Sequence, residues 1–210
     1  MHRKISKAGV ARLSLYYRAL ITAEGKGVSV VSSKVLSEKA GTNAAQLRSD
    51  LASFGSFGKR GAGYNVKALK GSISGILGKG RRWRVALVGV GNLGTALLSY
   101  GGFKEQGFDI VAAFDADPKK IGKKLRGVTV RKTDSISRIL PKDKVDIGII
   151  TVPAEFAQDV ADRLVKGGVR AIINFAPINL DLPDNVTVNS VDLSVELNTI
   201  SYLLDRNKRL

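Results

Sequence analysis

The sequence predicts an α/β protein in which an N-terminal winged helix-turn-helix domain precedes a C-terminal Rossmann-type domain with a parallel sheet. Three observations support this prediction. Positive charge is concentrated in the N-terminal part, the apolar spacing there is helical and later changes to alternating strands and helices, and a G-x-G-x-x-G motif lies where the second pattern begins. Alternation of strands and helices is typical of a parallel sheet with helices on both faces.

The positive charge is unevenly distributed along the chain. Residues 1–84 hold 17 Lys and Arg against three acidic residues, a net charge of +14, whereas residues 85–210 hold 17 against 15, a net charge of +2. A solubilising surface does not require such asymmetry, whereas basic side chains near phosphates gain free energy by releasing condensed counterions. The N-terminal part is therefore expected to bind nucleic acid.

The composition excludes several kinds of site. The chain has no cysteine, which excludes disulfides, thiol-based redox sensing and thiolate metal sites. The single histidine, His2, lies next to the N-terminus, so neither a histidine-based catalytic centre nor a metal site is expected. No apolar run is long enough to cross a bilayer, and no apolar segment follows the basic start, so we expect no membrane span, no secretory signal and a cytoplasmic protein.

Helical spacing dominates the N-terminal part. Three helices and a hairpin in this order form the plan of a winged helix-turn-helix. The predicted elements are a helix over Ser6–Ala23, a short strand over Val28–Val31, a helix capped by Ser32 or Ser33 and ended by Gly41, a helix over Asn43–Phe54 capped by Thr42, and a hairpin with a basic tip over Gly55–Val66.

A stretch rich in glycine and basic residues, Gly71–Arg82, is expected to link the two domains, although Ile73, Ile76 and Leu77 could form a short helix there. We therefore predict a DNA-binding domain over residues 1–78, a nucleotide-binding domain over 79–190 and a C-terminal helix over 191–210. Beyond the linker the predicted strands are Val85–Val88, Ile110–Phe114, Val145–Val152, Ala171–Phe175 and Val186–Val191, and the predicted helices are Asn92–Tyr100, Glu155–Val165 and Asp192–Leu204.

The motif Gly89-Val90-Gly91-Asn92-Leu93-Gly94 follows a predicted strand and opens a predicted helix. In this context the first glycine permits a tight turn, the second lets the backbone approach a pyrophosphate, and the third lets the helix pack against the strand. The free N–H groups at the start of the helix favour the phosphates of a dinucleotide. These six residues are therefore expected to bind a dinucleotide.

The type of dinucleotide is indicated by Asp115, which ends the second predicted strand. A carboxylate there accepts hydrogen bonds from ribose hydroxyls and repels a 2′-phosphate, so NADH and NAD⁺ are favoured over their phosphorylated forms. Two further segments end predicted strands at the edge where ligands bind in open α/β sheets. They are either the nicotinamide half of the site or ordinary strand endings, and consist of Thr151, Val152, Pro153 and Ala154, and of Asn174, Phe175, Ala176 and Pro177.

A catalytic role is not expected. The second domain has no histidine, and Gly101 and Gly102 interrupt the spacing of Tyr100 and Lys104, so no helix carries a Tyr-x-x-x-Lys pair. Too few residues follow the linker for a separate substrate domain. Binding without turnover is favoured, with a small NAD-dependent oxidoreductase as one alternative and a regulator that senses coenzyme A or another nucleotide as the second.

The third predicted helix is the expected recognition helix of the DNA-binding domain. Arg48 could contact guanine and Gln46 adenine, or either could hold a phosphate. Lys59 and Arg60 at the hairpin tip suit a narrow minor groove. The expected DNA contacts are Arg12, Asn43, Ala44, Gln46, Arg48, Ser49, Lys59 and Arg60.

Over essentially its full length the chain resembles the Rex family of redox-sensing transcriptional repressors. The motifs that carry the resemblance are Arg12–Arg18, Gln46–Leu51, Phe57–Tyr64, Gly89–Gly94 and Val191–Leu193. The resemblance implies a homodimer in which the C-terminal helices are exchanged between subunits, and operator DNA of dyad symmetry that is bound with NAD⁺ and released with NADH. It also implies that Arg18, Tyr100 and Asp192 switch partners between the two states, whereas Leu193 replaces a phenylalanine found in many relatives.

A protein without cysteine can still sense the redox state if it binds the oxidised and reduced forms of a nicotinamide cofactor with different affinities. The oxidised nicotinamide ring is cationic and the reduced ring is neutral, so an apolar pocket favours the reduced form. Such a pocket could consist of Phe175, Ala176, Pro177 and the partner's Leu193. Binding the two forms unequally is what a shift between a DNA-binding and a released state requires.

Overall fold

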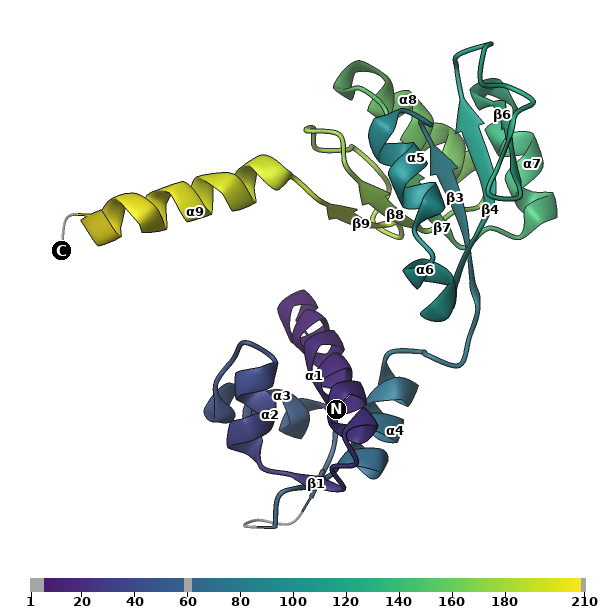
Figure 1. The fold of residues 1–210 in the computed structure, drawn as a ribbon. Coiled ribbons are helices and arrows are strands. Elements are labelled where there is room, and N and C mark those ends of the chain that lie inside the picture. The colour runs from purple at the N-terminus through teal and green to yellow at the C-terminus, as the bar shows by residue number, and fades with distance from the viewer. Residues whose placement is uncertain (1–5, 59–61, 209–210) are drawn as a thin grey trace. The chain divides into compact units, whose positions relative to one another are not determined.

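The computed structural model describes residues 6–58 and 62–208, and the side chains up to residue 206. The chain divides between Arg81 and Arg82 into two compact units, which we call unit 1 and unit 2 (Figure 1). The division lies close to the predicted domain boundary after residue 78. Each unit has its own apolar core.

Unit 1 contains four helices and a two-stranded sheet among its described residues. The helices are α1 (Lys7–Gly25), α2 (Ser33–Lys39), α3 (Ala44–Phe54) and α4 (Val66–Ile76). Their apolar faces enclose a core that includes Leu13, Tyr16, Leu20, Leu36, Leu47 and Ile73. The predicted winged helix-turn-helix class is confirmed, while the structure differs from the sequence prediction in three details: a helix cap, the extent of the linker and the wing.

The first detail is the cap of the third helix. Asn43, not Thr42, caps α3, because its Oδ1 accepts the N–H of Gln46 at 2.9 Å. The second is the extent of the linker. The short helix left open at Ile73, Ile76 and Leu77 is the end of a longer helix, α4, which begins before the predicted linker. Its residues Val66, Leu69 and Ile73 are buried and pack in the core that α1 shares. The glycines of this helix cost some helical stability, and burial of its apolar face offsets that cost.

The wing also differs from its prediction. Strand β2 (Tyr64–Asn65) pairs antiparallel with β1 (Val30–Val31), and not with a strand from residues 55–58. The ends of the intervening loop still approach each other, since a Cβ on Gly58 would lie 2.9 Å from the carbonyl oxygen of Gly63. Lys59 and Arg60, the predicted basic tip, lie outside the described residues.

Unit 2 is built on a seven-stranded sheet in the order β5-β6-β4-β3-β7-β8-β9. Every neighbouring pair is parallel except β5 and β6. Without the short β5, the order by sequence is 3-2-1-4-5-6, that of a Rossmann fold. The strands are β3 (Trp83–Val88), β4 (Phe108–Asp115), β5 (Lys124–Leu125), β6 (Val128–Lys132), β7 (Ile147–Ile150), β8 (Ala171–Asn174) and β9 (Thr187–Ser190).

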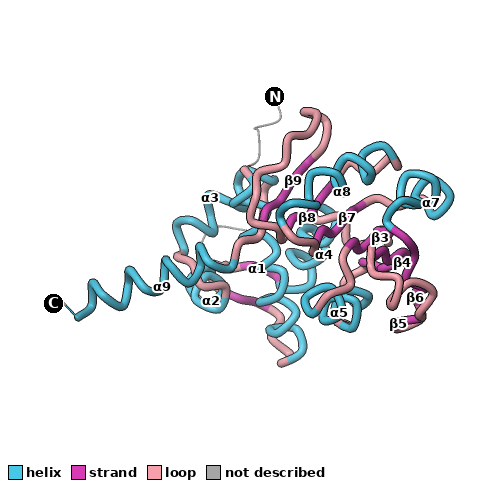
Figure 2. The backbone as a smooth tube through the Cα atoms, turned by 90° about the horizontal axis from the view of Figure 1, so that it is seen from above, coloured by secondary structure: helices cyan, strands magenta, loops and turns pink. Residues whose placement is uncertain are grey.

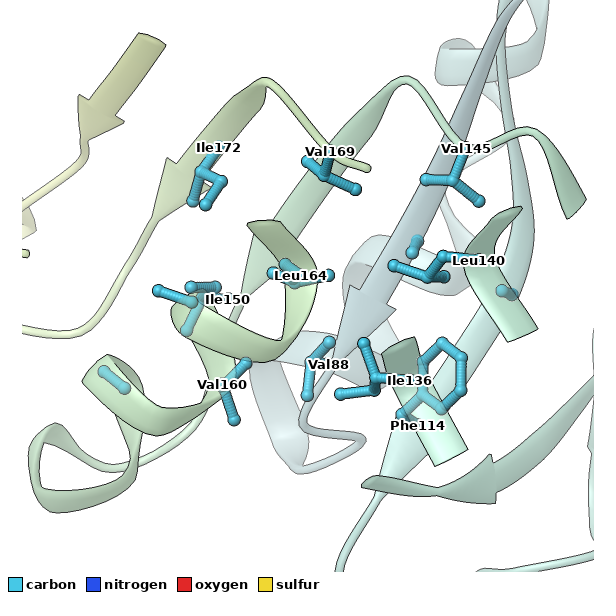
Figure 3. Packing of buried hydrophobic residues seen from close by; sticks show 14 of the residues in the cluster. Val88, Phe114, Ile136, Leu140, Val145, Ile150, Val160, Leu164, Val169 and Ile172 are labelled. Atoms are coloured by element: carbon cyan, nitrogen blue, oxygen red, sulfur yellow. The ribbon is translucent and has the colours of Figure 1, made fainter. Parts of the chain in front are cut away.

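Helices cover both faces of the sheet, as predicted. Figure 2 shows the strands lying between α5 (Asn92–Ser99) on one side and α7 (Ile136–Asp143) and α8 (Ala154–Lys166) on the other. Figure 3 shows how Ile136, Leu140 and Leu164 of α7 and α8 face Val88 and Phe114 of the sheet. On the opposite face Leu97 of α5 packs against a second cluster that contains Val85, Leu87 and Ile149.

Among the described residues of unit 2, five elements were not predicted: β5, β6, the short 3-10 helix η1 (Thr133–Ser135), α7 and the short α6 (Gly102–Glu105). The β5–β6 region is dense in lysine and arginine, which obscures the apolar alternation of a strand. Helix α7 contains Pro141, a residue that argues against a helix in a sequence pattern.

The last described element is α9 (Leu193–Lys208), which confirms the predicted C-terminal helix. Its apolar side chains are exposed, for example Leu197 at 65 % and Ile200 at 53 %. An amphipathic helix with an uncovered apolar face needs a partner surface. Among the described residues, no helix is long and apolar enough to span a membrane.

Candidate cofactor site and nucleic-acid interface

The glycine-rich loop at the end of β3 is closely packed at two of its glycines and open at the third. A Cβ on Gly89 would lie 2.6 Å from the carbonyl oxygen of Thr151, and one on Gly94 would lie 1.9 Å from that of Gly89. A Cβ on Gly91 would meet no atom within 4 Å. The space next to Gly91 is therefore available to a ligand, and a pyrophosphate fits there beside the N-terminus of α5.

Two side chains from neighbouring strands hold this loop in shape. The Oγ1 of Thr151 donates to the carbonyl oxygen of Gly89 at 2.7 Å, and the Oδ2 of Asp115 accepts the N–H of Val90 at 2.6 Å. Asp115 also accepts the N–H of Asp117 through Oδ1 and the Nζ of Lys120 through Oδ2, at 2.8 and 3.1 Å. Thr151 and Asp115 therefore position the loop in addition to their predicted role at the cofactor.

The electrostatics of Asp115 keep it ionised. Burial acts to raise the pKa of its carboxyl, but hydrogen bonds from the N–H groups of Asp117 and Val90 and from Lys120 outweigh this effect and lower the pKa. Oδ2 already has two donors, whereas Oδ1 has one and can accept a second from a ribose hydroxyl. In the sequence Lys120 is only a basic residue close to Asp115. Its hydrogen bond to the carboxylate depends on the turn between the two residues, which the sequence pattern does not reveal.

Four predicted segments meet at the carboxyl edge of the sheet. Val88 is in register with Phe114 and Ile150, and Ile150 with Asn174, so the loops after β3, β4, β7 and β8 lie side by side. The exposed members of the predicted site are Gly91, Asn92, Leu93, Pro153 and Pro177; the half-buried ones are Thr151, Val152 and Phe175; the buried ones are Gly89, Val90, Gly94, Asp115, Asn174 and Ala176.

Asn174 is committed to the protein itself. It is fully buried, its Nδ2 donates to the carbonyl oxygens of Ala176 and Ile178, and its Oδ1 accepts the N–H of Ala176. The amide thus shapes the turn after β8 instead of reaching a ligand directly. This use depends on a local turn geometry that the residue pattern did not reveal.

In unit 1 the exposed face of α3 carries Ala45, Arg48, Ser49 and Ala52. The spacing of three, four and seven residues places these side chains on one stripe of the helix. The Nη1 of Arg48 donates to the Oγ of Ser33 at 3.2 Å. Arg48 and Ser33 line a groove of about 840 Å³ between α2, α3 and the loop that leads to β2. Asn43 is exposed at the start of α3, whereas Ala44 is half-buried.

The opposite side of α3 is tied to α1 through Asp50, which the sequence prediction did not single out. Its Oδ2 accepts from the Nε of Arg12 at 2.6 Å and from the hydroxyl of Tyr16 at 2.8 Å, and its Oδ1 accepts from the Nη2 of Arg12 at 2.7 Å and from the Nε2 of Gln46 at 2.8 Å. We call these four residues the Asp50 network. Arg12 and Gln46, both predicted to contact DNA, are therefore engaged within the protein.

The ion pair with Arg12 is the main reason that the pKa of Asp50 is lowered, while burial opposes it. Burial is the main cause that raises the pKa of Tyr16 to about 12, followed by its hydrogen bond to the Asp50 carboxylate. Asp50 therefore remains an ionised acceptor and Tyr16 a neutral donor at neutral pH. The isolated acid in a strongly basic segment was a signal in the sequence that could have identified this network.

Acidification is expected to destabilise unit 1 through Asp50. Since the pKa of Asp50 in the folded state lies below the ordinary value of 3.8, the ionised carboxylate stabilises the folded state above pH 3.8, and this stabilisation is lost as the pH falls further toward the folded pKa. Urea unfolding between about pH 7 and pH 3, followed by circular dichroism, measures the effect. An Asp50→Asn variant should be less stable at neutral pH and should lose less stability on acidification; an unchanged pH slope would assign the effect to another carboxylate.

Comparison with known proteins identifies the family. The model of a family described as "CoA binding domain" matches residues 81–178, and that of a family described as "Putative DNA-binding protein N-terminus" matches residues 4–52. The redox-sensing transcriptional repressor Rex of Carboxydothermus hydrogenoformans is 48 % identical over 97 % of this chain and 98 % of its own length. That of Clostridium beijerinckii is 49 % identical over 99 % of this chain and 98 % of its own.

The chain belongs to the Rex family of redox-sensing transcriptional repressors.

Solved structures of the Rex family agree with the fold. The Rex-family repressor RSP in complex with β-NAD⁺ and operator DNA is 40 % identical and superposes with a TM-score of 0.91, covering 98 % of this chain and 95 % of RSP. RSP in complex with β-NADH is 38 % identical with a TM-score of 0.89, covering 98 % and 97 %. Because Rex proteins are repressors and not enzymes, the predicted absence of catalysis is confirmed and the oxidoreductase alternative is wrong.

The three residues that the Rex resemblance assigns to a switch lie on different units. Arg18 is exposed on α1 of unit 1. In unit 2, Tyr100 is 57 % exposed and meets Phe103 edge to face with ring centroids 5.0 Å apart, and the Oδ1 of Asp192 accepts from the N–H and hydroxyl of Ser194 at the start of α9. The switch role remains a prediction for all three.

Proposed function

We propose that this chain represses transcription by binding operator DNA through unit 1 and that it releases the operator when unit 2 binds NADH. The observation that carries the proposal is the open space at Gly91 in an otherwise closely packed loop, which fits a dinucleotide pyrophosphate. The basic N-terminal part supplies the second half of the proposal, because its net charge of +14 over residues 1–84 suits a DNA backbone.

NADH and NAD⁺ are the proposed ligands of the loop. The ionised Asp115 accepts ribose hydroxyls and repels a 2′-phosphate. Coenzyme A remains suggested by the family model that matches residues 81–178, yet similar Rex structures hold β-NAD⁺ and β-NADH. We therefore favour the nicotinamide dinucleotides, with Gly89–Gly94, Asp115 and the loops after β7 and β8 as the binding residues.

The redox discrimination follows from the nicotinamide half of the site. Phe175, Ala176 and Pro177 provide apolar surface after β8, and Leu193 of the partner subunit would complete it. Apolar surroundings disfavour a cationic ring, so the chain binds the reduced form more tightly. This difference in affinity shifts the population from a DNA-binding to a released state.

The working protein is proposed to be a homodimer joined through α9. The exposed apolar residues of α9 need a partner surface, and two copies present two recognition helices to the half-sites of an operator with dyad symmetry. Arg18, Tyr100 and Asp192 are the proposed switch residues that change partners between the two states. Among the described residues, no group of His, Cys, Asp or Glu could hold a metal ion.

The proposed DNA contacts are centred on α3. Asn43 and Ala44 lie at the start of α3 and Arg48 and Ser49 on its exposed face. Lys59 and Arg60, which lie outside the described residues, are proposed as further basic contacts on the strength of the sequence. A repressor acts where the chromosome lies, so we also propose a cytoplasmic location.

The function is tested by measuring operator affinity at fixed salt over a range of NADH/NAD⁺ ratios. We expect NADH to weaken operator binding by about 5- to 150-fold, the usual range of coupling between two sites, and NAD⁺ alone to leave it intact. Titration with coenzyme A is the control for the alternative ligand. An operator affinity that is the same at every ratio would refute the sensor function.

A further inference from the structure

Asp50 determines how the amide of Gln46 is oriented. An ionised carboxylate only accepts hydrogen bonds, so the atom of Gln46 at 2.8 Å from Oδ1 must be its Nε2. Arg12 and Tyr16 of α1 occupy the other acceptor positions of Asp50. The side chain of Gln46 is therefore held toward α1 by a group that is itself anchored by two residues of α1.

The position of Gln46 on α3 agrees with this orientation. It lies on the flank of the helix, half-buried, between the buried stripe of Leu47, Asp50 and Leu51 and the exposed stripe of Ala45, Arg48, Ser49 and Ala52. Within the exposed stripe Arg48 is the only charged residue, and its neighbours have small side chains. Its recorded contact, the Oγ of Ser33 at 3.2 Å, is exposed and can be replaced by a base edge.

We propose that Asp50 is a positioning residue for base readout, which holds Gln46 away from the bases and leaves Arg48 as the single side chain of α3 that reads a base by paired hydrogen bonds. Arginine pairs in this way with the O6 and N7 of guanine in the major groove. The small side chains beside Arg48 let the helix approach closely, and the methyl groups of Ala45 and Ala52 suit thymine. This inference rests on the proposed function, because it requires that α3 enters operator DNA.

The alternative is that Gln46 reads adenine. A double-mutant cycle with Gln46→Ala, Asp50→Asn and the double variant distinguishes these two roles of Gln46. Affinities are measured at one salt concentration for the operator, for operators with single base-pair substitutions and for unrelated DNA. If Gln46 affects DNA binding only through Asp50, the double variant has the same operator affinity as Asp50→Asn. We expect Gln46→Ala to keep the preference at every base pair and Asp50→Asn to weaken the preference at all of them, with affinity for unrelated DNA within about twofold of the original.

Arg48→Ala supplies the complementary result. It should lower the preference for one G·C pair in each half-site by about tenfold or more and leave the preference at the other base pairs unchanged. Tyr16→Phe removes one donor to Asp50 with little change in shape, so it should show the effect of Asp50→Asn in weaker form even if Asp50→Asn fails to fold. Ser53→Ala is the matched control, since its hydroxyl donates to the carbonyl oxygen of Ser49 in its own helix and, within the described part of the chain, to no residue of the Asp50 network.

Two results would overturn the proposal. One is loss of the preference for a particular base pair in Gln46→Ala, at an unchanged melting temperature. The other is a double variant that binds the operator more weakly than Asp50→Asn, which would show that Gln46 contacts DNA independently of Asp50. If the unsubstituted protein binds the operator no more tightly than unrelated DNA, the proposed function itself is refuted, and this outcome is distinct from a failure of the inference about Asp50.

Discussion

Replacing Gly91 by valine is expected to abolish the response of operator binding to NADH while leaving the cofactor-free protein stable and able to bind DNA. The backbone of Gly91 is extended, with φ −80° and ψ −159°, a conformation that valine adopts readily, and its Cβ would meet no protein atom within 4 Å. The side chain would instead fill the space proposed for the pyrophosphate. We expect NADH affinity to fall by about 100-fold or more, equivalent to about 2.7 kcal/mol.

Gly94→Ala is the matched contrast in the same loop. Its added Cβ would lie 1.9 Å from a backbone oxygen, so α5 or the loop must move and unit 2 must lose stability. Nicotinamide fluorescence measures cofactor binding, and thermal unfolding measures stability. A Gly91→Val protein that binds NADH normally would place the dinucleotide elsewhere, and one that melts early would show that the space at Gly91 is needed by the protein.

Removing α9 by ending the chain after Val191 is expected to convert the proposed homodimer into a monomer and to weaken operator binding by about 10²- to 10⁴-fold. Joining two DNA-binding units makes the second half-site contact intramolecular, and that advantage is lost when the units separate. Analytical ultracentrifugation measures the oligomeric state, and the affinity for a single half-site measures the remaining function of unit 1. The half-site affinity should be unchanged.

Single substitutions on α9 test the same point without truncation. Leu197→Asp places a charge on the exposed apolar face and should dissociate the dimer, whereas Asn198→Asp adds the same charge next to it and should be tolerated. If the protein without α9 remains a dimer, the interface lies outside α9.

Local patterns in the sequence were sufficient for the fold class and for the cofactor loop. The roles of Gly89 and Gly94 follow from a motif of six residues between a strand and a helix, so neighbours in sequence are also the neighbours in space. Strands such as β3 and β8 were predicted for the same reason, because a short apolar run identifies a buried strand. Helix α4 was hidden by its glycines, since burial against α1 and not intrinsic propensity stabilises it.

Charge distribution, periodicity and the glycine motif are all local properties, so they are enough to predict that a basic helical domain is joined to a dinucleotide-binding domain. The roles of several polar residues, by contrast, depend on the packed fold. Asp50 accepts hydrogen bonds from Arg12 and Tyr16, which precede it by 38 and 34 residues, and Thr151 donates to Gly89, which precedes it by 62 residues. Such partners depend on how helices and strands pack, and a hydrogen bond across that separation leaves no periodic trace in the chain.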